Sequence, residues 1–128
     1  MSNASTILDH PIVSSRYFFP RMDPIPDPYW VDAVDGSKLA CYYQAVHPDA
    51  KTVVYFHGNG EVVADYLPDF PEWIARAGYN LFLAEYRGYG MSTGNPALAG
   101  MLRGAACCAL SWTLSYPRPW GGLATAIR

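Results

Sequence analysis

The sequence lacks a basic cluster, a long apolar run and a signal for export. Its Lys and Arg residues are scattered and never form a stripe, which argues against a nucleic-acid partner. The longest weakly polar run, GAACCALSWTL, is far shorter than the roughly 20 residues needed to span a bilayer. The N-terminus has no basic region followed by an apolar one. We therefore expect a cytoplasmic protein with no membrane span and no nucleic acid as partner.

Cysteine is scarce as well. The three cysteines, Cys41, Cys107 and Cys108, have neither C-x-x-C spacing nor histidines at ligand spacing. A zinc site or a disulfide framework would show one of these patterns. The sequence therefore predicts buried, reduced thiols and no metal site.

What is present is the composition of one ordinary soluble domain: 128 residues, 51% of them hydrophobic, with a net charge of -2. Residues 1–28 are rich in proline, which removes backbone donors and opposes regular elements. We expect this segment to be an extended arm or a wrap over the surface of the domain. Residues 29–34 and 38–46 then flank Asp35 and Gly36, a strong hairpin signal, and an antiparallel pair is predicted there.

Two short apolar runs, TVVYFH (52–57) and NLFLAEY (80–86), have the character of strands buried on both faces of a parallel sheet. Apolar residues between them recur every three or four positions and predict a helix. Its expected buried face consists of Val63, Tyr66, Phe70, Trp73 and Ala77. Strand, helix and strand after a hairpin indicate an α/β fold with a mostly parallel sheet.

Prolines interrupt this helix. Pro68 and Pro71 predict a break, with a second piece opened by a capping box of Asp69 and Glu72 and ended by Gly78.

Another helix is predicted after the second run, with Asn95 as its N-cap and Pro96 in its first turn. Its apolar stripe is Leu98, Met101, Ala105, Cys108 and Trp112. Residues 115–128 do not continue the pattern, because Pro117 and Pro119 oppose regular structure and no β-branched run follows. We expect an irregular tail there.

Each buried strand runs into a glycine-rich loop, HGNG (57–60) after the first and RGYGMSTG (87–94) after the second. Glycines at the end of a buried strand allow backbone N–H groups to point into a cleft, which an oxyanion hole requires. For HGNG alone, a tight strand-to-helix turn explains the glycines equally well.

The second loop contains GMSTG, which matches G-x-S-x-G, the turn that carries the nucleophile of many serine hydrolases. That turn holds its serine at the tip of a sharp bend directly between a strand and a helix. Here the strand ends near Tyr86 and the helix begins only after Asn95. We therefore expect Ser92 not to be a nucleophile.

HGNG, a helix ending in ARAGYN, the strand LFLAEY and RGYGMSTG, in this order, resemble the N-terminal half of the α/β-hydrolase family. The most similar branch is that of the serine aminopeptidase-like and monoacylglycerol-lipase-like hydrolases, and the resemblance covers roughly residues 30–114. It implies an α/β-hydrolase-like fold that acts on a small ester or amide by acyl transfer without a metal or an organic cofactor.

The resemblance also implies roles for the loop residues. The backbone N–H of Asn59 would form part of the oxyanion hole, and His57 would be structural rather than the catalytic base. The residues expected to line the cleft are His57, Gly58, Gly60, Arg87, Gly88 and Tyr89.

The rest of the family's machinery is missing. The family places its serine, acid and histidine in that order, yet no acid follows Glu85 and no histidine follows His57. Where the nucleophile is expected, the sequence reads PRPWGGLATAIR, with Pro119 in the place of serine and no strand before it. The fold is thus expected to be truncated before the nucleophile strand, and no residue of this chain is assigned as catalytic.

The predicted organisation is an arm (1–28), the N-terminal part of an α/β-hydrolase domain (29–114) and a divergent irregular tail (115–128). The chain by itself is expected to be an incomplete and inactive serine hydrolase. Without the nucleophile strand, one edge of the strand at 52–57 would be open, which favours self-association. The alternatives are a short, divergent, non-catalytic module that binds a small ligand or a protein, and a fragment without a function of its own.

Overall fold

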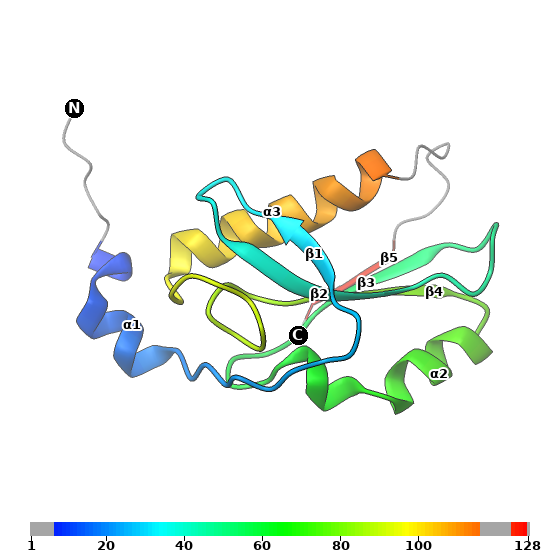
Figure 1. The fold of residues 1–128 in the computed structure, drawn as a ribbon, viewed down its shortest axis with the longest axis horizontal. Coiled ribbons are helices and arrows are strands. Elements are labelled where there is room, and N and C mark those ends of the chain that lie inside the picture. The colour runs from blue at the N-terminus through cyan, green and yellow to red at the C-terminus, as the bar shows by residue number, and fades with distance from the viewer. Residues whose placement is uncertain (1–6, 116–123, 128) are drawn as a thin grey trace.

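The computed structural model describes residues 7–115 and 124–127. They form a five-stranded sheet in the order β1-β2-β4-β3-β5, with α3 on one face and α2 on the other (Figure 1). The strands are β1 (Tyr29–Asp32), β2 (Lys38–Gln44), β3 (Thr52–Phe56), β4 (Asn80–Ala84) and β5 (Ala124–Ile127). The helices are α1 (Pro11–Tyr17), α2 (Asp69–Arg76) and α3 (Leu98–Ser115), with short 3-10 helices η1 (Ile7–Asp9) and η2 (Val63–Tyr66).

The sheet is mixed. β1 and β2 form the expected antiparallel hairpin, with Val31 opposite Leu39, and β2 is also antiparallel to β4. β3 is parallel to β4 on one side and to β5 on the other. The predicted α/β-hydrolase-like fold with its N-terminal hairpin is confirmed, although parallel pairs make up half of the sheet rather than most of it.

β5 corrects the prediction that residues 115–128 are irregular throughout and that β3 has an open edge. Residues 124–127 pair in parallel with β3, with Val53 opposite Ala124 and Phe56 opposite Ile127. Only Thr125 and Ile127 of this four-residue run favour a strand, and the N–H and C=O groups along the edge of β3 supply its pairing. Pro119 lies outside the described residues.

Part of the N-terminal arm is helical, which corrects the prediction of an extended segment over residues 1–28. α1 begins with Pro11 at its first position, where proline has no hydrogen bond to lose. His10 Nδ1 accepts a hydrogen bond from the Ile12 N–H at 3.2 Å. After Pro11 the prolines resume only at Pro20, so they do not oppose a helix between the two.

The arm also caps α3. This helix begins at Leu98, three residues after the expected N-cap Asn95, so that assignment is wrong. The Ala99 N–H donates instead to Asp9 Oδ1 at 3.0 Å. A cap supplied from 90 residues away cannot be read from the local sequence.

The helix between β3 and β4 is broken as predicted, into η2 and α2, and Gly78 follows with φ of +87°. The predicted capping box is wrong, because Pro68 is the N-cap of α2 and no side chain caps it. The predicted buried face holds as far as Phe70, which packs against the core, and is wrong beyond it: Trp73 is 62% exposed, Ala77 is exposed, and Ile74 packs against the core instead. Because η2 and α2 are separate helices, a helical period counted continuously from η2 into α2 assigns the wrong residues to the buried face of α2.

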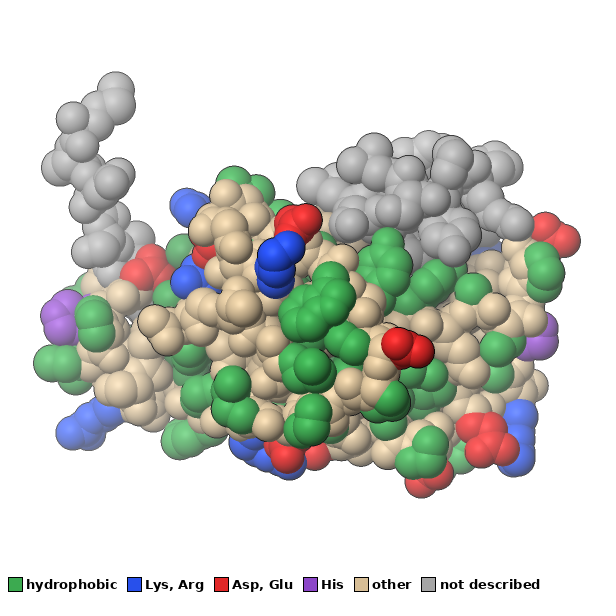
Figure 2. All heavy atoms as spheres, viewed as in Figure 1, with side chains coloured by type: hydrophobic (Ala, Val, Ile, Leu, Met, Phe, Trp, Pro, Cys, Tyr) green, Lys and Arg blue, Asp and Glu red, His purple; other side chains and the backbone are tan. Residues whose placement is uncertain are grey.

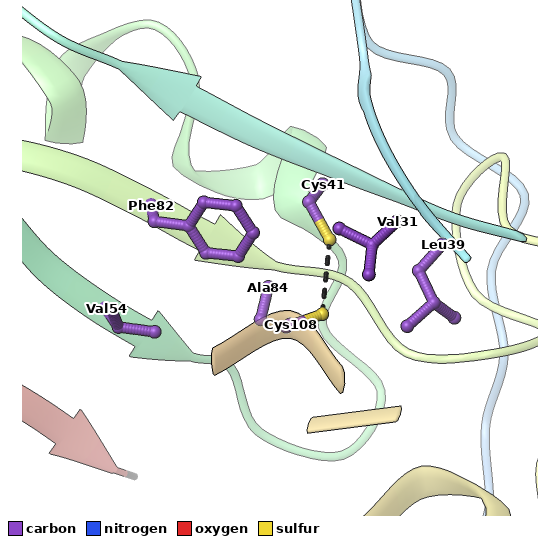
Figure 3. Packing of buried hydrophobic residues seen from close by; sticks show 7 residues of the cluster. All are labelled: Val31, Leu39, Cys41, Val54, Phe82, Ala84 and Cys108. Carbon is purple, nitrogen blue, oxygen red and sulfur yellow. Dashed lines mark hydrogen bonds between the residues drawn. The ribbon is translucent and has the colours of Figure 1, made fainter. Parts of the chain in front are cut away.

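The face of the sheet under α3 carries one core cluster, drawn in Figure 3. Cys41 on β2 and Cys108 on α3 point toward each other there, with their Sγ atoms 3.5 Å apart. A disulfide bond requires about 2.05 Å, so these are free, buried thiols, as predicted. Burial raises the pKa of Cys41, with a smaller contribution from Cys108, and keeps the thiol protonated. A second cluster, around Tyr55, Leu81 and Leu83, lies on the α2 side.

Candidate functional site

The two glycine-rich loops leave the sheet side by side. β3 and β4 are parallel neighbours, with Phe56 opposite Ala84. His57 and Glu85 are therefore the next residues at the carboxyl ends of these strands, the edge where α/β proteins bind their ligands.

A buried pair joins the two strand ends. His57 Nε2 lies 2.6 Å from Glu85 Oε1, and both side chains are almost fully buried. Glu85 also accepts hydrogen bonds from the N–H groups of Val63 and Tyr86. Burial alone lowers the pKa of His57, but the hydrogen bond and the charge of Glu85 outweigh it, so the pKa is raised above 6.5. Sequence reasoning missed this pair, although two polar residues that end adjacent buried strands are a usable signal.

Glu61 closes the first loop on itself. Its Oε2 accepts the Gly58 N–H at 2.7 Å and the Tyr66 hydroxyl at 2.6 Å. The next backbone donor, the N–H of Asn59, has no acceptor among residues 7–115 and 124–127. Asn59 is also exposed. The loop thus leaves one backbone donor without an acceptor in this part of the chain.

The side chain of Asn59 binds the N-terminal arm. Its Nδ2 donates to the Tyr17 carbonyl at 2.5 Å, and its Oδ1 accepts the Phe19 N–H at 3.3 Å. The Tyr89 hydroxyl, from the second loop, donates to the same Oδ1 at 2.9 Å. A further contact joins the Gly90 N–H to the Arg21 carbonyl at 2.7 Å. Residues 17–21 therefore lie across both loops, a contact that the sequence did not reveal.

Ser92 is not placed as a nucleophile. It is 4% exposed, and its Oγ accepts the N–H of Ala40 on β2 at 2.9 Å. Thr93 is tied to the same strand, because the Lys38 N–H donates to Thr93 Oγ1 and the Thr93 N–H donates to the Lys38 carbonyl. These bonds anchor the second loop along β2, so the serine has a structural role.

Burial and an ion pair hold the remaining residues of the second loop. Tyr89 and Gly88 are buried, and the Arg87 guanidinium pairs with Asp35 in the hairpin turn. Gly90 has φ of +56°, and a Cβ there would lie 2.7 Å from Glu85 Oε2, so only glycine suits this position. His57, Gly88 and Tyr89 are buried, and the assignment of these loop residues to the lining of a cleft stays a prediction.

The described residues also limit the chemistry. Within residues 7–115 and 124–127, no group of three His, Cys, Asp or Glu side chains could hold a metal ion. No helix in this part of the chain combines the length and apolar character needed to cross a bilayer. On the face shown in Figure 2, Lys and Arg side chains are dispersed among acidic and apolar ones. A cytoplasmic location stays a prediction.

The chain is similar in sequence to several known proteins. No protein-family model matches the chain. The uncharacterized protein YfhR of Escherichia coli K12 is 30% identical over 104 residues, which are 72% of this chain and 36% of YfhR. The alpha/beta hydrolase domain-containing protein WAV2 of Arabidopsis thaliana is 29% identical over 87 residues, 66% of this chain and 28% of WAV2. The chain thus spans about a third of the length of the curated relatives it matches.

A solved structure has the same fold. The Pyrococcus furiosus esterase Pf2001 superposes with a TM-score of 0.64 at 17% identity, over 80% of this chain and 43% of the esterase. The strand order, the two glycine-rich loops and the similar proteins all indicate the same fold. The chain has an α/β-hydrolase-like fold, and it is similar to part of a protein named for an alpha/beta hydrolase domain.

Proposed function

We propose that this chain supplies the first half of the site of a serine hydrolase that cleaves an ester or amide by acyl transfer. In this proposal the backbone N–H of Asn59 donates to the oxyanion that forms when a serine attacks the substrate carbonyl. The second donor and the nucleophile belong to a turn that would follow β5. No residue of the 128 is assigned as the nucleophile, the acid or the base.

The observation that carries the proposal is that the backbone N–H of Asn59 makes no hydrogen bond to the described residues. It lies in the loop at the carboxyl end of β3, and it has no acceptor among the described residues, whereas the neighbouring Gly58 N–H is taken by Glu61. A donor fixed in a loop stabilises developing negative charge at little reorganisation cost. The Pf2001 protein is an esterase, which favours a small ester as the substrate.

The proposal also concerns what is missing. Ser92 is bonded to β2, and the family's later acid and histidine have no counterparts after Glu85 and His57. A serine without a neighbouring base is a weak nucleophile near neutral pH. The hydrolase activity is therefore proposed for a longer protein, and the chain of 128 residues is proposed to be inactive alone.

The genomic DNA downstream of the Arg128 codon tests this proposal. Translation in all frames is expected to show a reading frame in which a G-x-S-x-G turn follows β5, with an acid and a late histidine after it. A stop codon before such a turn in every frame would contradict the proposal and favour a short binding module.

The corresponding extended protein gives a biochemical test. It is expected to hydrolyse short p-nitrophenyl esters well above the buffer rate, because the turn after β5 would complete the oxyanion hole. The 128-residue chain, assayed beside it, is expected to stay at the buffer rate. A folded extended protein with an intact G-x-S-x-G turn and no activity on ester or amide probes would speak against a hydrolase.

A further inference from the structure

An aromatic hollow lies on the α2 side of the sheet, apart from the two glycine-rich loops. Its volume is about 310 Å³, which is enough for a small molecule. The hollow is bordered by β3, η2 and α2. Its lining residues are Tyr55, Asp65, Tyr66, Asp69, Phe70 and Trp73.

Three rings form a packed wall of this aromatic hollow. The ring centroids of Tyr55 and Tyr66 are 5.0 Å apart, and those of Tyr55 and Phe70 are 5.1 Å apart. Hydrogen bonds hold the tyrosines, since the Tyr66 hydroxyl donates to Glu61 and lies 3.1 Å from the Tyr55 hydroxyl. The indole of Trp73 stands beside this wall and is 62% exposed. Ring faces carry negative electrostatic potential and attract cations.

The charged side chains that line the hollow are both carboxylates. Asp65 is already engaged, because its Oδ2 accepts from Arg21 Nη1 at 2.7 Å and from the Val62 N–H at 3.1 Å. Among residues 7–115 and 124–127, no Lys, Arg or His nitrogen lies within 4.0 Å of an Asp69 carboxylate oxygen. Asp69 and Trp73 are four residues apart on α2 and so face the same side of the helix. One carboxylate beside an exposed indole thus lacks a counter-ion in this part of the protein.

We propose that the aromatic hollow binds a small quaternary ammonium cation. The methyl groups of such a cation would pack against the rings, and its positive charge would lie near Asp69. A quaternary ammonium needs no hydrogen-bond acceptor, which fits a wall whose tyrosine hydroxyls already bond to each other and to Glu61. An anion would meet two carboxylates and no free cation among the lining residues. The proposal does not depend on hydrolase activity.

Choline and its neutral carbon isostere, 3,3-dimethylbutan-1-ol, separate this cation site from a general apolar surface. The purified chain is titrated with each compound, and binding is followed by tryptophan fluorescence and calorimetry. Choline is expected to bind saturably, and the isostere is expected to bind on the order of tenfold more weakly, because it lacks the charge that the rings and Asp69 attract. Equal binding of the two compounds, or no saturable binding of choline to the folded chain, would overturn the proposal.

Matched variants on α2 locate the site. Asp69→Asn and Trp73→Ala are each expected to weaken choline binding severalfold. Glu72→Gln removes one negative charge from the same helix outside the hollow, where Glu72 pairs with Arg76, and is expected to leave the affinity unchanged. Circular dichroism confirms that each variant is folded. If Glu72→Gln weakened binding as much as Asp69→Asn does, the effect would reflect net charge and the site would be refuted.

Discussion

Replacing Glu85 with alanine is expected to lower the free energy of unfolding by about 3–5 kcal/mol, the cost of removing one partner from a buried ion pair. The substitution leaves His57 buried without its carboxylate partner. It also removes the acceptor of the Val63 and Tyr86 N–H groups. Urea unfolding followed by circular dichroism measures the change. A loss below about 1 kcal/mol, typical of an exposed pair, would show that this contact does not hold the two loops together.

Glu85→Gln keeps the shape of the side chain and removes its charge, so it remains informative if the alanine variant does not fold. Glu72→Gln, in an exposed pair with Arg76, is the matched control and is expected to leave the urea midpoint almost unchanged.

The same pair predicts a pH dependence. The pKa of His57 in the folded protein is raised above 6.5, its value without the fold. The stabilisation from protonated His57 is therefore fully present below that pH and is lost as the pH rises through the folded-state pKa. The stability difference between the wild type and Glu85→Gln is expected to narrow over this range. A difference that widens with rising pH would contradict the assigned direction of the shift.

Asn59→Pro is expected to produce the second large effect, in the extended protein described above. Proline removes the backbone N–H, and the loss of one oxyanion donor costs about 2.7–4 kcal/mol of transition-state stabilisation, or roughly 100- to 1000-fold in kcat. Asn59→Ala keeps the N–H and is expected to cost much less in kcat. Steady-state assays of both variants, after circular dichroism confirms folding, measure the difference. Equal losses in the two folded variants would remove the Asn59 backbone from the mechanism.

The alanine variant separates the two roles of Asn59. Its side chain bonds to Tyr17, Phe19 and Tyr89, so Asn59→Ala is expected to loosen the arm and lower the melting temperature while kcat changes little. These readouts distinguish a positioning side chain from an oxyanion donor.

The sequence was informative where short-range patterns decide the structure. β3 and β4 form within the predicted runs because four of the five residues in each strand are apolar. The distance of Ser92 from the next helix in the sequence argues against a nucleophile. In the structure the Ser92 Oγ accepts a hydrogen bond from the Ala40 N–H, which fits a structural role.

Short-range sequence patterns do not predict contacts between segments that are far apart in the chain. β5 forms because β3 offers a free edge, although its own four residues predict no strand. α3 begins where Asp9 caps it, from 90 residues away. Trp73 was assigned to the buried face by counting through a break, and its exposure opens the aromatic hollow. In each case the deciding partner lies in another part of the chain.

Labelling by a fluorophosphonate probe tests most directly the claim that this chain carries the fold of a serine hydrolase without its nucleophile. The folded 128-residue chain is expected to show no labelling above that of a heat-denatured sample, because the Ser92 hydroxyl is buried against β2 and has no base beside it among the residues that the structure describes. Ser92→Ala is the control, and its folding is checked because it leaves the Ala40 N–H without an acceptor, at about 1–3 kcal/mol. Labelling that maps to Ser92 by peptide mass spectrometry, and disappears in this variant, would contradict the account.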